Sequence, residues 1–101
     1  MAQYNKLVRD RIPEILDAKG VSYEKRIVEG EEYKTALIIK LHEELAEFTE
    51  AGAIEELADI LEVVEALKVL PEYADVERIR KEKHDERGGF AGGIVLTGEK
   101  S

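Results

Sequence analysis

Apolar residues recur with helical spacing on both sides of a turn of small residues in the middle of the chain. Residues three and four positions apart share one face of an α-helix. Before the turn this face consists of Leu37, Ile38, Leu41, Leu45 and Phe48. After it, the face consists of Ile54, Leu57, Ile60, Leu61, Val64 and Leu67. The pattern predicts two long helices, one over about 31–51 and one from 54 to Leu70-Pro71, folded back on each other at Ala51-Gly52-Ala53.

The segments flanking this hairpin predict two shorter helices. Proline suits the first turn of a helix and glycine its end, so residues 13–19 should be helical, ending at Gly20. Asp75 is a suitable N-cap for a third helix over Val76 to about Asp85.

Two further segments are expected to be extended. Residues 21–28 alternate imperfectly between apolar and polar side chains, and Ile94-Val95-Leu96 is a short apolar run. The second segment could pair with residues 23–28 of the first. The expected class is therefore all-α: a helical hairpin core with short extended N- and C-terminal segments, in one domain over residues 1–101.

Two helices with apolar stripes cannot seal a core alone. We therefore expect a second copy of the chain to complete a four-helix-bundle type of assembly, as a homodimer or homotetramer.

Composition narrows the possible functions. A net charge of −8 argues against binding to a nucleic-acid polymer or to an anionic membrane. The chain has no cysteine, which excludes disulfides, a thiol nucleophile and a thiolate zinc site. The first ten residues lack the apolar core of a signal peptide, so the expected location is the cytoplasm.

Acidic side chains dominate the hairpin. Between Leu41 and Leu67 there is no lysine or arginine, yet there are nine acids: Glu43, Glu44, Glu47, Glu50, Glu55, Glu56, Asp59, Glu62 and Glu65. A stabilised surface helix normally alternates charges of both signs. The chain itself leaves this repulsion uncompensated, so we expect positive charge to be supplied from outside the chain.

Four of these acids mirror one another about the turn. In an antiparallel hairpin, Glu47 lies level with Glu56, and Glu44 with Asp59. Carboxylates that converge in this way are the ligands preferred by hard cations, so the pattern predicts a site for Mg²⁺ or Mn²⁺. An acidic hairpin exposed to solvent is the alternative. The chain contains no E-x-x-H, which argues against a carboxylate–histidine di-iron site.

Basic residues lie on both sides of the hairpin in the sequence. Lys6, Arg9 and Arg11 precede it, and Arg80, Lys83 and Arg87 follow it. If the third helix folds beside the hairpin, its bases face the carboxylates, as binding of a metal-bound polyphosphate requires. The alternative role of both basic groups is charge pairing with the acidic hairpin.

Three segments together resemble a known superfamily. E-E-L-A-E at 43–47 and E-L-A-D at 56–59 are similar to the E-E-x-x-E … E-x-x-D signature of the all-α nucleoside-triphosphate pyrophosphohydrolases, which include MazG, the dimeric dUTPases and phosphoribosyl-ATP pyrophosphohydrolase. The flanking Y-N-K-L-V-R-D-R-I-P-E-I at 4–15 and R-G-G-F at 87–90 resemble one small branch of it. Eight residues separate Glu47 from Glu56, fewer than in larger members.

The resemblance implies an oligomeric, Mg²⁺-dependent hydrolase that cleaves a nucleotide to a monophosphate and pyrophosphate. By motif position, the metal ligands would be Glu44, Glu47, Glu56 and Asp59. The catalytic acids would be Glu43 and Glu47, which orient the attacking water.

Two other functions stay open from the sequence. The substrate could be phosphoribosyl-ATP instead of an aberrant nucleoside triphosphate, because no base-recognition motif is present. Alternatively, the chain could be a non-catalytic acidic helical binding or regulatory module that docks a basic partner.

Overall fold

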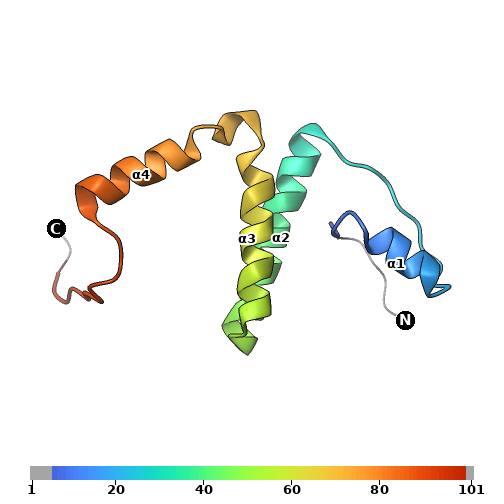
Figure 1. The fold of residues 1–101 in the computed structure, drawn as a ribbon, viewed down its shortest axis with the longest axis horizontal. Helices are drawn as coiled ribbons and strands as arrows, with labels where there is room; N and C mark the ends of the chain where they lie inside the picture. Colours follow the sequence, from blue (N-terminus) through green and yellow to red (C-terminus); the bar gives the residue numbers. More distant parts are fainter. Residues whose placement is uncertain (1–5, 100–101) are drawn as a thin grey trace.

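The computed structural model describes residues 6–99, and all regular structure in that range is helical. In chain order the elements are α1 (Ile12–Ala18), α2 (Gly30–Ala51), α3 (Ile54–Lys68), the 3-10 helix η1 (Pro71–Tyr73) and α4 (Val76–Arg87) (Figure 1). The all-α prediction is confirmed. Tyr4 and Asn5, the first two residues of the N-terminal motif, lie outside the described residues.

The hairpin turn forms where the sequence predicts it. Gly52 adopts a left-handed conformation with a φ of 63°, and its N–H donates to the carbonyl of Phe48 at 2.8 Å. This is a common way to end a helix, and glycine adopts it without a steric penalty. The backbone of Ala53 is extended, and α3 begins at the next residue. A two-residue connection therefore places α2 and α3 antiparallel.

The end of the hairpin connects to α4 through η1. Helix α3 ends before Leu70, and Pro71 starts the 3-10 turn, in agreement with the expected stop at this proline. Lys34 of α2 lies over the ring of Tyr73 at 5.2 Å from its centroid, which ties η1 to the hairpin. Lys68 bonds Glu77 at 3.2 Å and ties the start of α4 to the end of α3.

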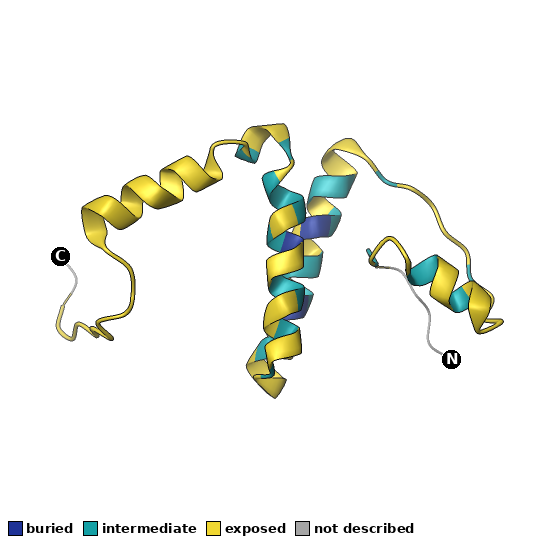
Figure 2. Cartoon of the chain, viewed as in Figure 1, coloured by how far each residue is buried: buried dark blue, intermediate teal, exposed yellow. Residues whose placement is uncertain are grey.

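The hairpin encloses very little apolar volume. In the described residues only Leu37 and Val63 are buried hydrophobic side chains, and the third buried residue is Glu44 (Figure 2). The chain exposes 9208 Å², whereas a compact monomer of this mass exposes about 5,800 Å². Its radius of gyration is 18.0 Å, against about 13 Å for a compact domain of 100 residues. This chain therefore does not close a core by itself.

Only part of the apolar face of α3 packs against α2. The prediction that the whole apolar stripe of this helix is buried is therefore wrong for the single chain. The side of α3 packed against α2 is centred on Val63 and includes the partly buried Glu56 and Ile60. In contrast, Leu57 and Leu61 are 44% and 58% exposed. The apolar arc covers about half of the helix circumference, and one neighbouring helix cannot cover an arc that wide.

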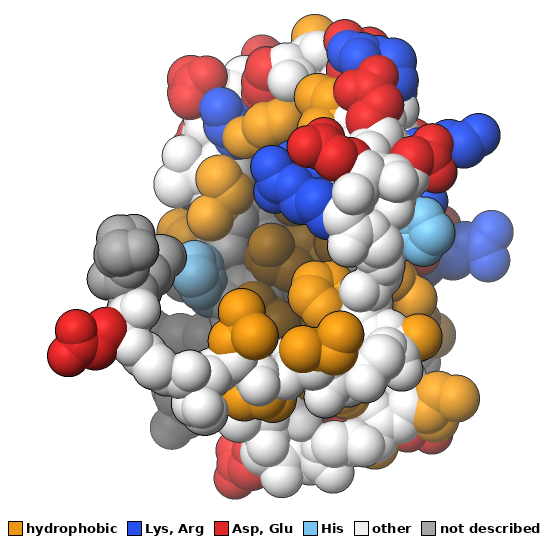
Figure 3. All heavy atoms as spheres, turned by 90° about the vertical axis from the view of Figure 1, so that its left-hand side faces the viewer, with side chains coloured by type: hydrophobic (Ala, Val, Ile, Leu, Met, Phe, Trp, Pro, Cys, Tyr) orange, Lys and Arg blue, Asp and Glu red, His pale blue; other side chains and the backbone are white. Residues whose placement is uncertain are grey.

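Two opposite faces result from this packing. Ile38 and Leu45 of α2 are also partly exposed, and helical spacing places them on the same side of the hairpin as Leu57 and Leu61. We call these four residues the open apolar face. Figure 3, viewed from the side of α4, shows hydrophobic side chains gathered in a hollow. The acidic residues discussed below lie on the opposite face.

Helix α4 and the segment after it form an arm that extends away from the hairpin (Figure 1). Among the described residues the extensive helix–helix packing is between α2 and α3, and α4 is exposed along its whole length. Within the described residues α4 does not fold beside the hairpin, so the condition under which its bases would face the carboxylates is not met in the single chain. Residues 6–99 also contain no strand, so the expected pairing of 23–28 with 94–96 does not form within this chain.

Candidate metal centre

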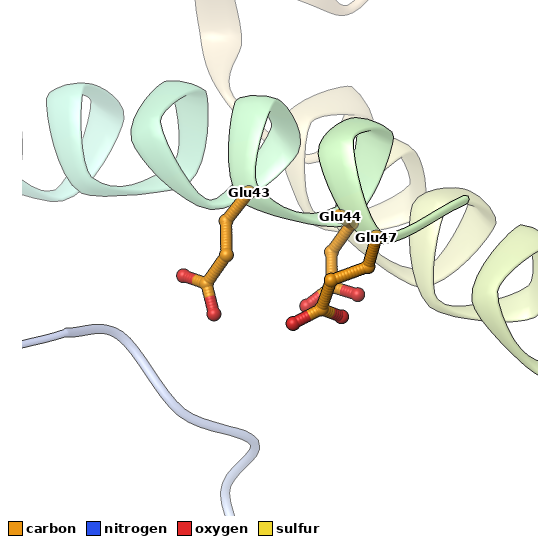
Figure 4. A group of neighbouring side chains, drawn as sticks. All are labelled: Glu43, Glu44 and Glu47. Carbon is orange, nitrogen blue, oxygen red and sulfur yellow. The ribbon is translucent and has the colours of Figure 1, made fainter. Parts of the chain in front are cut away.

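Three glutamates of α2 bring their carboxylates together on the acidic face. One oxygen each from Glu43, Glu44 and Glu47 lies within 4.8 Å of the others. Figure 4 shows the three side chains projecting from the same side of the helix, with the carboxylates of Glu44 and Glu47 next to each other. Spacings of one, three and four residues produce this convergence, because they keep side chains on adjoining sectors of one helix.

Glu44 is the unusual member of this cluster because it is buried. Its exposed fraction is 5%, and its Oε2 atom has no hydrogen-bond partner in the described part of the chain. Burial raises the pKa of the Glu44 carboxyl above its ordinary value, and the neighbouring charge of Glu47 adds to this, against the opposing effect of Lys40. An ionised carboxylate is costly to bury unless a cation or a donor reaches it.

Lys40 supplies one such cation. Its Nζ atom lies 3.2 Å from Oε1 of Glu44 and 3.3 Å from Oε1 of Glu43. Partial burial would raise the pKa of Glu43, but the bonds from Lys40 and Lys6 outweigh it and hold that pKa below its ordinary value. Lys40 therefore neutralises one oxygen of each glutamate and leaves Oε2 of Glu44 without a partner.

The N-terminal segment crosses the acidic face and pairs with both helices of the hairpin. Nζ of Lys6 lies 3.3 Å from Oε1 of Glu43, and Nη2 of Arg9 lies 2.7 Å from Oδ1 of Asp59. The expectation that positive charge must come from outside the chain is thus corrected. Lys6, Arg9 and Lys40 provide it, from positions just outside the stretch that lacks bases.

The acids of α3 approach the cluster from the other helix without joining it. Glu56 lines an open hollow of about 250 Å³ with Glu47, Glu50 and Ala51, at the turn end of the hairpin. Asp59 stands in the ion pair with Arg9. The group of three neighbouring carboxylates in the described residues thus contains Glu43, whereas the sequence pattern selected Glu56 and Asp59 as partners of Glu44 and Glu47.

The basic residues of α4 lie on the arm, away from this cluster. Arg80 donates to Glu77 of its own helix at 2.9 Å, and Lys83 and Arg87 are exposed further along the arm. Arg11 is exposed at the start of α1. In the single chain, the cations that reach the acidic face come from the N-terminal segment and from α2.

Sequence reasoning missed Lys40. The signal was present, since Lys40 precedes Glu43 and Glu44 by three and four residues, the spacing at which opposite charges pair on a helix. Lys40 lies one residue before Leu41, where the stretch without lysine or arginine begins.

The residues of the cluster fit a hard divalent cation. All of them offer carboxylate oxygens, the donors that Mg²⁺ and Mn²⁺ prefer, and one buried oxygen lacks a partner. Glu56 and Asp59 lie on α3 and are not part of this group of three carboxylates.

The chain matches no protein-family model, no curated protein and no solved structure. Within residues 6–99, none of the helices combines the length and the apolar character needed to span a bilayer.

Proposed function

We propose that this protein is a divalent-metal-dependent pyrophosphohydrolase. Its substrate would be a nucleoside triphosphate or a phosphoribosyl-ATP-like nucleotide, cleaved to a monophosphate and pyrophosphate. The observation that carries the proposal is the buried Oε2 of Glu44, which has no hydrogen-bond partner within residues 6–99 and belongs to a group of three neighbouring carboxylates. The resemblance of the acidic motif to the all-α pyrophosphohydrolases supports the choice of substrate class.

Each acid has a defined role in this proposal. Glu44 and Glu47 would hold Mg²⁺, or Mn²⁺, and Glu56 and Asp59 would complete the ligand set from α3. A bound divalent ion would polarise a phosphate oxygen of the nucleotide and would lower the pKa of a bound water molecule. Glu43 or Glu47 would orient a water molecule for in-line attack at phosphorus and accept its proton. The bond between the monophosphate and the pyrophosphate leaving group then breaks.

The cations on the acidic face suit a polyphosphate. Lys6 and Arg9 pair with carboxylates in this chain. Ammonium and guanidinium groups bind phosphate oxygens by the same charge-assisted hydrogen bonds that they make to carboxylates. We propose that Arg9 exchanges Asp59 for a phosphate oxygen when metal and nucleotide bind together. Arg11, Arg80, Lys83 and Arg87 remain candidates for further phosphate contacts in the assembled protein.

The open apolar face supports the proposed oligomer. Its four residues are partly exposed on one side of the hairpin, and a second hairpin packed there would form a four-helix bundle. A homodimer is the simplest such assembly, and a homotetramer would pair two of them.

One observation favours the alternative function. Ion pairs within the chain already neutralise Glu43 and Asp59. Such pairs stabilise an acidic hairpin without a metal ion, as a non-catalytic binding module requires. Such a module would dock a basic partner, would not respond to Mg²⁺ and would release no pyrophosphate.

Pyrophosphate release with Mg²⁺ tests the proposal against this alternative. The substrates are phosphoribosyl-ATP and a panel of ordinary and modified nucleoside triphosphates. The parent protein should turn over at least one of them, and Glu56→Gln should lower that rate by about a hundredfold through the loss of one charged ligand. Glu55→Gln, at the neighbouring exposed position, is the matched control and should retain the parent rate. Equal rates in all three proteins would reject the assigned site.

Arg9→Gln is expected to affect metal binding and turnover in opposite directions. Freeing Asp59 from its ion pair should tighten Mg²⁺ binding by about two- to fivefold, the range that an exposed pair contributes. Loss of the guanidinium should slow pyrophosphate release by at least about tenfold. Calorimetric titration with Mg²⁺ and a steady-state assay measure the two effects.

Arg26→Gln is the control for this experiment. Like Arg9, Arg26 pairs with an acidic side chain. Its partner is Glu32 at the start of α2, far along the helix from the cluster. Weaker Mg²⁺ binding in Arg9→Gln than in Arg26→Gln would contradict the exchange of partners.

A further inference from the structure

Two extended segments of this chain leave their backbone groups without partners. Within the described part of the chain, residues 22–28 and 94–97 take no part in backbone–backbone hydrogen bonds. Each segment also exposes apolar side chains: Ile27 is 87% exposed, Val95 84% and Leu96 91%. Unpaired backbone and exposed β-branched side chains are typical of strands that still lack a neighbour.

The two segments do not meet in one copy because the hairpin lies between them. Residues 22–28 follow α1 on one side of the hairpin, and residues 94–97 end the arm on the other side (Figure 1). Helix α4 has 12 residues, which carry the tail away from the hairpin over about 18 Å. Gly88 and Gly93 then turn the chain with φ values of 80° and 60°.

We propose that residues 94–97 of one copy pair as a strand with residues 22–28 of a second copy, so that a two-fold dimer exchanges its C-terminal arms. Each segment occurs once per chain, and two-fold symmetry gives each copy one donated and one accepted strand. Each segment then gains one partner strand, and two-fold symmetry closes the assembly as a dimer. The inference concerns assembly and holds whether or not the acidic cluster hydrolyses nucleotides.

The exposed surface is large enough for this occupant. The chain exposes roughly 3,400 Å² more than a compact monomer of its mass, and a stable dimer buries about 800 Å² on each partner. Exposed large hydrophobic side chains lie on the open apolar face and along the arm, and Figure 3, viewed from the side of the arm, shows hydrophobic side chains gathered there. In the proposed dimer, the second copy covers the open apolar face, and its residues 22–28 bind the end of the first copy's arm.

Cross-linking between introduced cysteines tests the exchange, because the described chain has no cysteine of its own. Ile27→Cys and Val95→Cys proteins are mixed and treated with a short bismaleimide, which tolerates an uncertain strand register. The mixture should form a covalent dimer at least about tenfold faster than a mixture of Glu62→Cys and Val95→Cys, since bound segments meet at millimolar effective concentration. The double variant Ile27→Cys/Val95→Cys should likewise link between copies.

Two cross-linking results would overturn the exchange. One is a double variant that links within one chain, retaining the monomer mass of 11.4 kDa. The other is a mixture that links no faster than the Glu62→Cys control. Hydrogen exchange on the unaltered protein gives a second measurement that needs no substitution: amides of 22–28 and 94–97 should be protected at concentrations where light scattering shows dimers. Unprotected amides in both segments of such a dimer would also reject it.

Discussion

Glu44→Gln is expected to abolish activity and at the same time to stabilise the metal-free protein. Glutamine keeps the shape of the side chain but removes the charge that would hold the proposed cation. Pyrophosphate release with Mg²⁺ should fall by at least about a hundredfold. The stability gain arises because the ionised carboxylate is buried with one oxygen unpartnered. Removing that charge should raise the free energy of unfolding by about 1 kcal/mol, or the melting temperature by about 4–8 °C.

The stabilising effect of Glu44→Gln should depend on pH in a defined direction. The pKa of Glu44 is raised in the folded protein above its ordinary value of 4.5. Below that ordinary value the carboxyl is protonated in both the folded and the unfolded chain, so parent and variant should be about equally stable. As the pH rises through the raised pKa, the parent loses stability that the variant keeps.

Thermal denaturation at about pH 4 and about pH 7, each with and without Mg²⁺, measures these effects together. The difference between variant and parent should be small at the lower pH and full at the higher one. Added Mg²⁺ should stabilise the parent by about 2.7 kcal/mol at a hundred times its dissociation constant, and should leave the variant unchanged. Glu62→Gln, an exposed glutamate of α3, controls for the loss of one negative charge. A variant less stable than the parent at neutral pH would show that Glu44 does not carry an uncompensated charge.

Leu61→Lys is expected to dissociate the proposed oligomer and strongly destabilise the chain. Leu61 is 58% exposed in the single copy, and a lysine at an exposed position normally changes stability by no more than about 0.5 kcal/mol. In a four-helix bundle the same position is buried. There the variant loses the transfer free energy of a leucine and places a charge in an apolar interface, a cost of about 3 kcal/mol or more.

Glu62→Lys is the matched control, since it introduces the same side chain at the next residue of α3, away from the open apolar face. Light scattering at micromolar concentration should show monomer for Leu61→Lys and the parent oligomer for the control. The melting temperature of Leu61→Lys should fall by more than about 10 °C. If both variants keep the parent mass and melting temperature, the open apolar face is not an interface.

The sequence by itself determined the number, type and approximate ends of the long helices. Gly52 ends α2, and Pro71 follows the end of α3, because each residue restricts the backbone at its own position. These preferences act over a few neighbouring residues, so local pattern is sufficient to find them. The same holds for the convergence of Glu43, Glu44 and Glu47, which share one helix.

The tertiary structure alone decided which side of each helix is covered and which charges meet. A wide apolar arc is compatible with several neighbours, so periodicity could not tell the buried Val63 from the exposed Leu61. The ion pair of Arg9 with Asp59 joins residues 50 positions apart. Such contacts depend on how whole elements pack in space, and nothing in the residues next to either partner specifies them. Packing is likewise what buries Glu44, and its burial turns an acidic helix into a candidate cation site.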